Sequence, residues 1–125
     1  MIYPRVYSES ERQRMRSKRL YTEGSELLTV TISNLAASAQ KLYGFSTDAT
    51  IRKYLPLNYI RIFNDSSCNL KVYVNNSSTS EPILKNTIWT YEGNFNTFLL
   101  ENMDTENEAT GTDIYCTVQR KPLGG

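Results

Sequence analysis

The sequence lacks histidine entirely, and this absence removes several kinds of chemistry at once. Histidine is the commonest general base and the commonest ligand of transition metals in proteins, so Ser–His and Cys–His nucleophile pairs are excluded. The six glycines are scattered, and two of them are the final residues, so the chain has no glycine-rich loop to hold a phosphate group. Enzyme chemistry on this chain would have to depend on carboxylates.

Cysteine is nearly as scarce, because the chain has only Cys68 and Cys116. Two cysteines are too few for a disulfide scaffold, and neither belongs to a C-x-x-C pair, so zinc and thioredoxin-type chemistry have no basis in the sequence. Cys116 alternates with Ile114 and Val118, which predicts a small core residue. Cys68 lies in a polar turn, which leaves it open to exposure, and a disulfide between the two has no special support.

Long apolar runs are missing too. No stretch approaches the roughly 20 apolar residues that span a bilayer, so we expect no transmembrane helix. No apolar segment follows the basic residues near the N-terminus, so we expect no secretory signal peptide. A length of 125 residues is typical of one domain. We expect a protein that is made in the cytoplasm and either stays there or leaves inside an assembled particle.

Acidic residues are few at the N-terminus, where the first 22 residues hold six Lys/Arg against two Glu. The remaining 103 residues hold eight Lys/Arg against eleven Asp/Glu. This split predicts a basic arm over residues 1–25, a compact domain over 26–121 and a tail over 122–125. The arm suits three roles, namely binding a neighbouring subunit, contacting nucleic-acid phosphates, or keeping the protein soluble as a disordered tail. Its candidate contact residues are Arg12, Arg14, Arg16, Lys18 and Arg19.

The body consists of short segments in which apolar and polar residues alternate. Leu28, Val30 and Ile32 alternate with Thr29, Thr31 and Ser33, which is typical of a half-buried strand. Similar segments recur about every 8–14 residues, separated by polar turns. About seven to eight such strands without a long helix predict an all-β fold, a single antiparallel β-sandwich of jelly-roll type.

Two connections matter for the arrangement of these strands. The turn residues 64–67 (Asn-Asp-Ser-Ser) predict that the strands 57–63 and 70–74 form a hairpin with each other. Residues 35–45 fit both a short helical turn and an alternating strand, and we interpret them as a connection.

Carboxylates gather in one segment, and its members are Glu101, Asp104, Glu106, Glu108 and Asp113. Two of them could flank a bond as acid and base, or several could bind Ca²⁺ through oxygen atoms. The segment lacks the D-x-[DN]-x-[DN]-G order of a calcium loop, so the favoured interpretation is a solvated acidic loop. We therefore predict no catalytic residue, no metal site and no cofactor.

Aromatic residues are the other candidates for a binding surface, with nine Tyr, four Phe and one Trp. Tyr59, Phe63 and Tyr73 lie on the sides of their strands opposite the aliphatic residues, and the predicted hairpin would bring all three to one face. Such a face would pack on another sheet or subunit, or stack on sugar rings. Trp89 is predicted to be a core or interface anchor rather than a platform for a ligand.

Five segments follow one another in a set order over residues 59–120. They are 60–65 (Ile-Arg-Ile-Phe-Asn-Asp), 70–74 (Leu-Lys-Val-Tyr-Val), 84–87 (Leu-Lys-Asn-Thr), 98–104 (Phe-Leu-Leu-Glu-Asn-Met-Asp) and 111–118 (Gly-Thr-Asp-Ile-Tyr-Cys-Thr-Val). This order resembles the small β-sandwich virion proteins of phages and other prokaryotic viruses. The resemblance covers about half of the chain and implies a capsid, decoration, vertex or tail component without catalytic residues, which would assemble with copies of itself and with other virion proteins.

Two classes of function follow. The first is a structural protein located in a virion, acting through homo-oligomeric assembly, with nucleic acid as a further candidate partner of the arm and no membrane span. The second is a carbohydrate-binding or adhesin module that uses surface aromatic residues.

Overall fold

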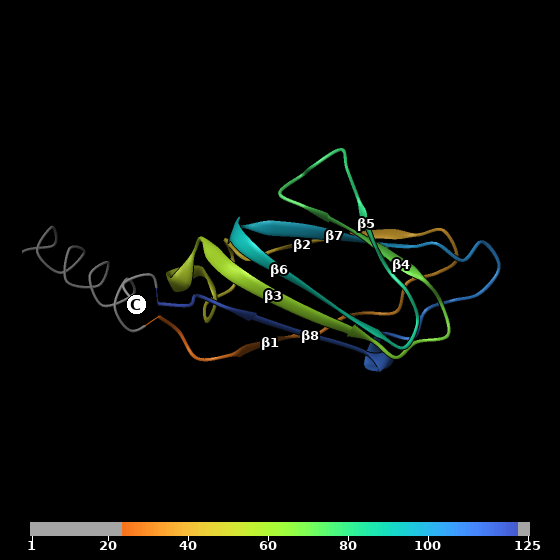
Figure 1. Cartoon of the computed structure of the whole chain (residues 1–125), viewed down its shortest axis with the longest axis horizontal. Coiled ribbons are helices and arrows are strands. Elements are labelled where there is room, and N and C mark those ends of the chain that lie inside the picture. The colour runs from red at the N-terminus through yellow and green to blue at the C-terminus, as the bar shows by residue number, and fades with distance from the viewer. Residues whose placement is uncertain (1–23, 123–125) are drawn as a thin grey trace, which may run out of the picture.

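The computed structural model describes residues 24–122, which form eight strands in two layers (Figure 1). Most of the predicted arm, including its five candidate contact residues, lies outside the described residues. No helix within residues 24–122 is long and apolar enough to cross a membrane. The elements are β1 (Leu28–Val30), β2 (Gln40–Gly44), the 3₁₀ helix η1 (Arg52–Tyr54), β3 (Leu57–Asn64), β4 (Leu70–Val74), β5 (Glu81–Ile83), β6 (Thr87–Phe95), β7 (Thr97–Asn102), the 3₁₀ helix η2 (Gly111–Asp113) and β8 (Ile114–Gln119).

The strands form two four-stranded antiparallel sheets, with the orders β1-β8-β3-β6 and β2-β7-β4-β5 (Figure 1). Four of the pairings are those of a chain that doubles back on itself as one long two-stranded ribbon. They are β1 with β8, β2 with β7, β3 with β6 and β4 with β5. Two further pairings, β3 with β8 and β4 with β7, roll that ribbon into two layers. This connectivity defines a jelly roll. The predicted all-β sandwich is therefore confirmed.

The core lies between the sheets, where alternation within each strand directs the apolar side chains. In β3, for example, Ile60 and Ile62 are fully buried while Arg61 between them is exposed. Phe95 and Phe98 are buried on either side of the short link between β6 and β7, where the chain passes from one sheet to the other. Burying such a side chain contributes about 1.5–3 kcal/mol, so these positions supply much of the stability of the fold.

The predicted hairpin between residues 57–63 and 70–74 is wrong, because β3 and β4 belong to different sheets. The connection between them crosses the sandwich and is held by Asn64, whose side chain is completely buried. Its amide donates to the carbonyls of Cys68 (2.8 Å) and Ile83 (3.0 Å), and its side-chain oxygen accepts from the backbone N–H of Ser66 (3.1 Å). Alternation alone showed which residues face inward but not which strand is the neighbour.

Two smaller predictions also need correction. Residues 35–45, interpreted as a connection, contain the strand β2, which pairs with β7 along its whole length. Cys68 is not exposed but 1% accessible, because the turn that carries it folds inward and its thiol approaches the carbonyl of Asn107 at 3.6 Å. Cys68 and Cys116 are both free and buried, and burial raises the pKa of the Cys116 thiol to about 12.

The two ends of the described chain leave the sandwich together. The N–H of Ser25 donates to the carbonyl of Arg120 (2.7 Å), and the N–H of Arg120 donates to the hydroxyl of Ser25 (2.8 Å). The loop 103–113, which joins β7 to β8, lies at the opposite end of the molecule (Figure 1). The attachment point of the basic arm and the four acidic residues of this loop are thus separated by the length of the strands.

Candidate functional site

The side of the β1-β8-β3-β6 sheet that points away from the core, here called the first outer face, carries an apolar row. Strand register places Phe63 between Ile88 on β6 and Tyr115 on β8. The rings of Phe63 and Tyr115 are stacked, with centroids 6.0 Å apart and planes inclined by 20°. Ile88 and Tyr115 are 53% and 56% exposed. Large apolar side chains thus stand at outward positions of an antiparallel sheet, which usually hold polar residues, and this makes the face a candidate interaction surface.

Charge is sparse on the rest of this face. The row next to Phe63 holds the exposed Arg61 between two threonines, Thr90 and Thr117. At the end of the face, Lys121 lies 4.0 Å from the ring centroid of Tyr59 and pairs with a carboxylate of β6 at 3.1 Å. Few charges, several aromatic rings and one arginine are the composition of the buried centre of a protein–protein interface.

The corresponding side of the β2-β7-β4-β5 sheet, the second outer face, is different. It too has an apolar row, in which Leu99 lies between Leu42 and Tyr73. The next row, however, is charged, because Glu101 accepts a hydrogen bond from Gln40 and pairs with Lys71 at 3.7 Å. A hollow of about 300 Å³ opens beside the apolar row. Its lining residues are Gln40, Tyr73, Asn76, Ser77 and Leu99.

The structure separates the aromatic residues that the sequence grouped. Tyr59 and Phe63 lie on the first outer face, but Tyr73 lies on the second, so the prediction that all three share one face is wrong. Trp89 faces the core, is 8% exposed, and donates its indole N–H to the carboxylate of Glu81. Its ring is therefore part of the core and is not exposed on either outer face.

Sequence reasoning missed four exposed or half-buried members of the two apolar rows. Ile88 and Tyr115 complete the row on the first outer face, and Leu42 and Leu99 complete the row on the second. Each stands at a position of its strand where alternation calls for a polar residue, and this departure from the pattern is the signal that could have found them. Their grouping depends on strand order, which the sequence does not show.

The acidic residues do not form one cluster, because Glu101 lies on the second outer face while the others lie in the loop 103–113. The carboxylate of Asp104 accepts the backbone N–H groups of Glu106 (2.8 Å) and Asn107 (2.9 Å). These two bonds and a third from the Asn107 side chain hold the pKa of Asp104 below its ordinary 3.8. Among residues 24–122, no group of three or more cysteine or acidic side chains is placed to hold a metal ion.

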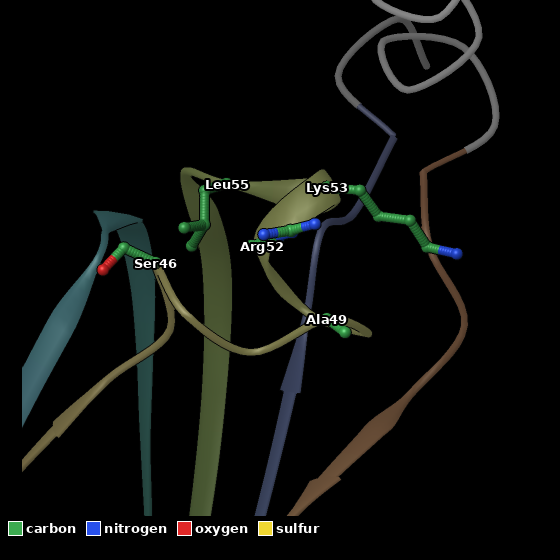
Figure 2. Close-up of a pocket in the computed structure, with 5 residues that line it drawn as sticks. All are labelled: Ser46, Ala49, Arg52, Lys53 and Leu55. Atoms are coloured by element: carbon green, nitrogen blue, oxygen red, sulfur yellow. The ribbon is translucent and has the colours of Figure 1, made fainter.

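A second hollow, of about 490 Å³, lies at the loop between β2 and β3 and is lined by Ser46, Ala49, Arg52, Lys53 and Leu55 (Figure 2). The Asp48 carboxylate orders this loop by accepting the N–H groups of Thr50 (2.8 Å) and Ile51 (2.9 Å). Figure 2 shows Lys53 extending away from Arg52, toward the segment that leads into β1. An anion site requires converging donors, so we assign no ligand to this hollow.

No protein-family model matches the chain, and no curated protein matches its sequence. Two solved structures are similar in outline. The cupin domain of Schizosaccharomyces pombe Cnp3 has a TM-score of 0.42 and 14% identity, covering 78% of this chain and 63% of that one. The chain thus spans less than two thirds of the cupin-domain chain. The tobacco streak virus coat protein has a TM-score of 0.41 and 12% identity, covering 80% of this chain and 88% of the coat protein. The assignment of this chain to the jelly-roll fold accordingly rests on its own strand order.

Proposed function

We propose that this chain is a structural component of a virus particle and that it assembles by burying its first outer face against a second copy of the chain. One observation carries the proposal most. The stacked rings of Phe63 and Tyr115, with Ile88 beside them, form an exposed apolar row on a sheet face that has little charge. Burying this row on a partner removes apolar area from water at about 25 cal/mol per Å².

The size of the face indicates that it does not act alone. Four strands about 4.8 Å apart, the longest with nine residues at about 3.3 Å each, span a flat area of at most about 600 Å². A stable interface buries roughly 800 Å² on each partner. A further contact is therefore needed, and the basic N-terminal arm can supply it.

The arm is proposed to bind the acidic loop of a neighbouring copy. The first described residue, Gly24, lies at one end of the sandwich, and the loop 103–113 lies at the other. The arm is rich in Lys and Arg, while the loop holds Asp104, Glu106, Glu108 and Asp113. Opposite charges at opposite ends favour head-to-tail contacts between copies, which build rings or extended arrays.

The test of the outer-face contact is the mass of the full-length protein in solution, measured by light scattering over a range of concentrations. We expect Ile88→Glu combined with Tyr115→Glu to reduce the assembly to single chains, because each substitution places an unpaired charge in the interface. The matched control is Leu42→Glu on the second outer face, whose side chain is also 53% exposed. A wild-type protein that is monomeric at every concentration, or a double variant that assembles normally, would contradict the proposal.

A further inference from the structure

The hollow on the second outer face has the features of a small binding site that assembly does not require. It is lined by one aromatic and one aliphatic residue, Tyr73 and Leu99, and by three polar residues, Gln40, Asn76 and Ser77, here called its rim. An aromatic ring beside a few amide and hydroxyl groups matches the surface of a pyranose sugar, whose C–H face is apolar and whose edge is hydroxylated. The volume of about 300 Å³ is at the lower end of the range for small-molecule pockets.

The rim is held rigidly by the turn after β4. Asn75 and Asn76 both have a positive φ, of 55° and 58°, which is the conformation that a tight turn requires. The side chain of Asn75 donates to the carbonyl of Asn94 (2.8 Å) and accepts the N–H of Asn96 (3.0 Å), so the turn is tied to the link between β6 and β7. A fixed turn presents the side chains of Asn76 and Ser77 to a ligand without a large loss of entropy on binding.

Apart from the Gln40 amide, which donates to Glu101, the polar groups of the residues that line the hollow are available for bonding. Within residues 24–122, neither the Asn76 amide nor the Tyr73 hydroxyl takes part in a hydrogen bond. The Ser77 hydroxyl oxygen accepts the N–H of Thr79 (3.0 Å), which leaves its proton free to be donated. A sugar hydroxyl both donates and accepts, so this set of groups can satisfy it.

Local charge selects the class of ligand. Of the residues that the structure describes, no charged one lines the hollow, and the carboxylate of Glu101, which accepts a hydrogen bond from the lining residue Gln40, is paired with Lys71. The hollow therefore has little net charge to attract an anion or a cation. We propose that this hollow binds one neutral pyranose unit of a glycan, with the ring of Tyr73 as the stacking surface and Asn76 as the main hydrogen-bonding partner.

The experiment uses the full-length protein and defined probes, namely the methyl glycosides of glucose, galactose, mannose and N-acetylglucosamine and short oligomers of each. Binding is measured by saturation-transfer NMR and calorimetry. We expect at least one probe to bind, Tyr73→Ala to weaken it about tenfold, and Tyr73→Phe to change it by less than about threefold, because the ring surface contributes most of the affinity. Asn76→Gly, which keeps the backbone conformation, is expected to weaken binding several-fold.

The control is Tyr115→Ala, which removes an exposed ring from the first outer face and should leave sugar binding unchanged. Absence of binding by every probe up to about 10 mM would overturn the inference. Binding that survives Tyr73→Ala, or that is lost in Tyr115→Ala, would overturn it as well. The inference and the proposed assembly fail separately, since one is read from sugar binding and the other from the mass of the protein.

Discussion

The two outer faces of the sandwich are built by the same alternation and both carry an apolar row, yet they differ in what surrounds that row. On the first outer face, Phe63 and Tyr115 stack beside threonines and a single Arg61. On the second, the row next to Leu99 contains Lys71 and Glu101, and a hollow interrupts the surface. A flat face with few charges suits a large protein partner, whereas a charged face with a hollow suits a small ligand. This difference is the basis for proposing a protein partner for the first outer face and a small ligand for the second.

The largest effect is expected from disrupting the connection between β3 and β4, because this connection places the two strands in different sheets and so determines which residues lie on each outer face. We expect Asn64→Ala to lower the free energy of unfolding by about 3 kcal/mol, since it removes a donor to the buried carbonyls of Cys68 and Ile83 and the acceptor of the Ser66 N–H. Urea unfolding would measure this. Asn96→Ala, at an exposed position, is the control and should change stability by less than about 0.5 kcal/mol. Equal effects of the two substitutions would contradict the role given to Asn64.

The second prediction concerns the arm, which is proposed to add a contact that neither face provides. Replacing Arg12, Arg14, Arg16, Lys18 and Arg19 by glutamine should lower the assembled mass while keeping the length of the chain. Salt should lower the assembled mass of the wild type, because the Debye length falls from about 10 Å at 0.1 M to about 3 Å at 1 M and screens the attraction between arm and loop. The variant, which lacks the arm's charges, should depend less on salt. Light scattering in low and high salt measures both.

Substituting Glu106 and Glu108 by glutamine should reproduce this loss of mass if the arm binds the acidic loop. If the arm variant instead keeps its mass and loses affinity for single-stranded or duplex DNA, the arm binds nucleic acid rather than a neighbouring loop.

The third prediction separates the two apolar rows. Phe63→Ala and Leu99→Ala remove half-buried side chains at the centre of the first and second outer faces. Each should reduce stability by about 1 kcal/mol in urea, because part of the side chain packs on its neighbours. Only Phe63→Ala should weaken self-association, by about tenfold in the concentration for half assembly. Comparable losses of assembly in both variants would mean that both faces join subunits.

The smallest expected effect is a dependence of the protein's stability on pH through Asp104 in the loop 103–113. The folded-state pKa of Asp104 lies below 3.8, so its hydrogen-bonded carboxylate stabilises the fold above that value. This contribution is lost as pH falls through the lower, folded-state pKa. We expect wild type to be slightly more stable than Asp104→Ala at pH 7 and the difference to vanish in strong acid, as thermal unfolding would show. A difference that grows on acidification would reverse the assigned sign.

Much of this fold could be predicted from the sequence. The features that could not be predicted depend on contacts between residues that are far apart in the chain. The strands 57–63 and 70–74 were located correctly, but their pairing was not, because the turn residues 64–67 are compatible with a hairpin and with a crossing. Residues 40–44 were missed as a strand because the run leading to them also fits a helical turn. Phe63 was recognised as an outward aromatic, while its neighbours Ile88 and Tyr115 were not, since they come from distant parts of the chain.

By itself, the sequence determined which side chains face inward in most of the strands, where most of the turns fall, and that the N-terminal segment is basic. These properties are local, because a strand's alternation and a turn's residue preferences are set within a few residues. Only the tertiary structure decided which strands are neighbours, and so which aromatic residues share a face. That decision depends on contacts between residues far apart in the chain, such as Asn64 with Ile83, and on the packing of two sheets around a common core.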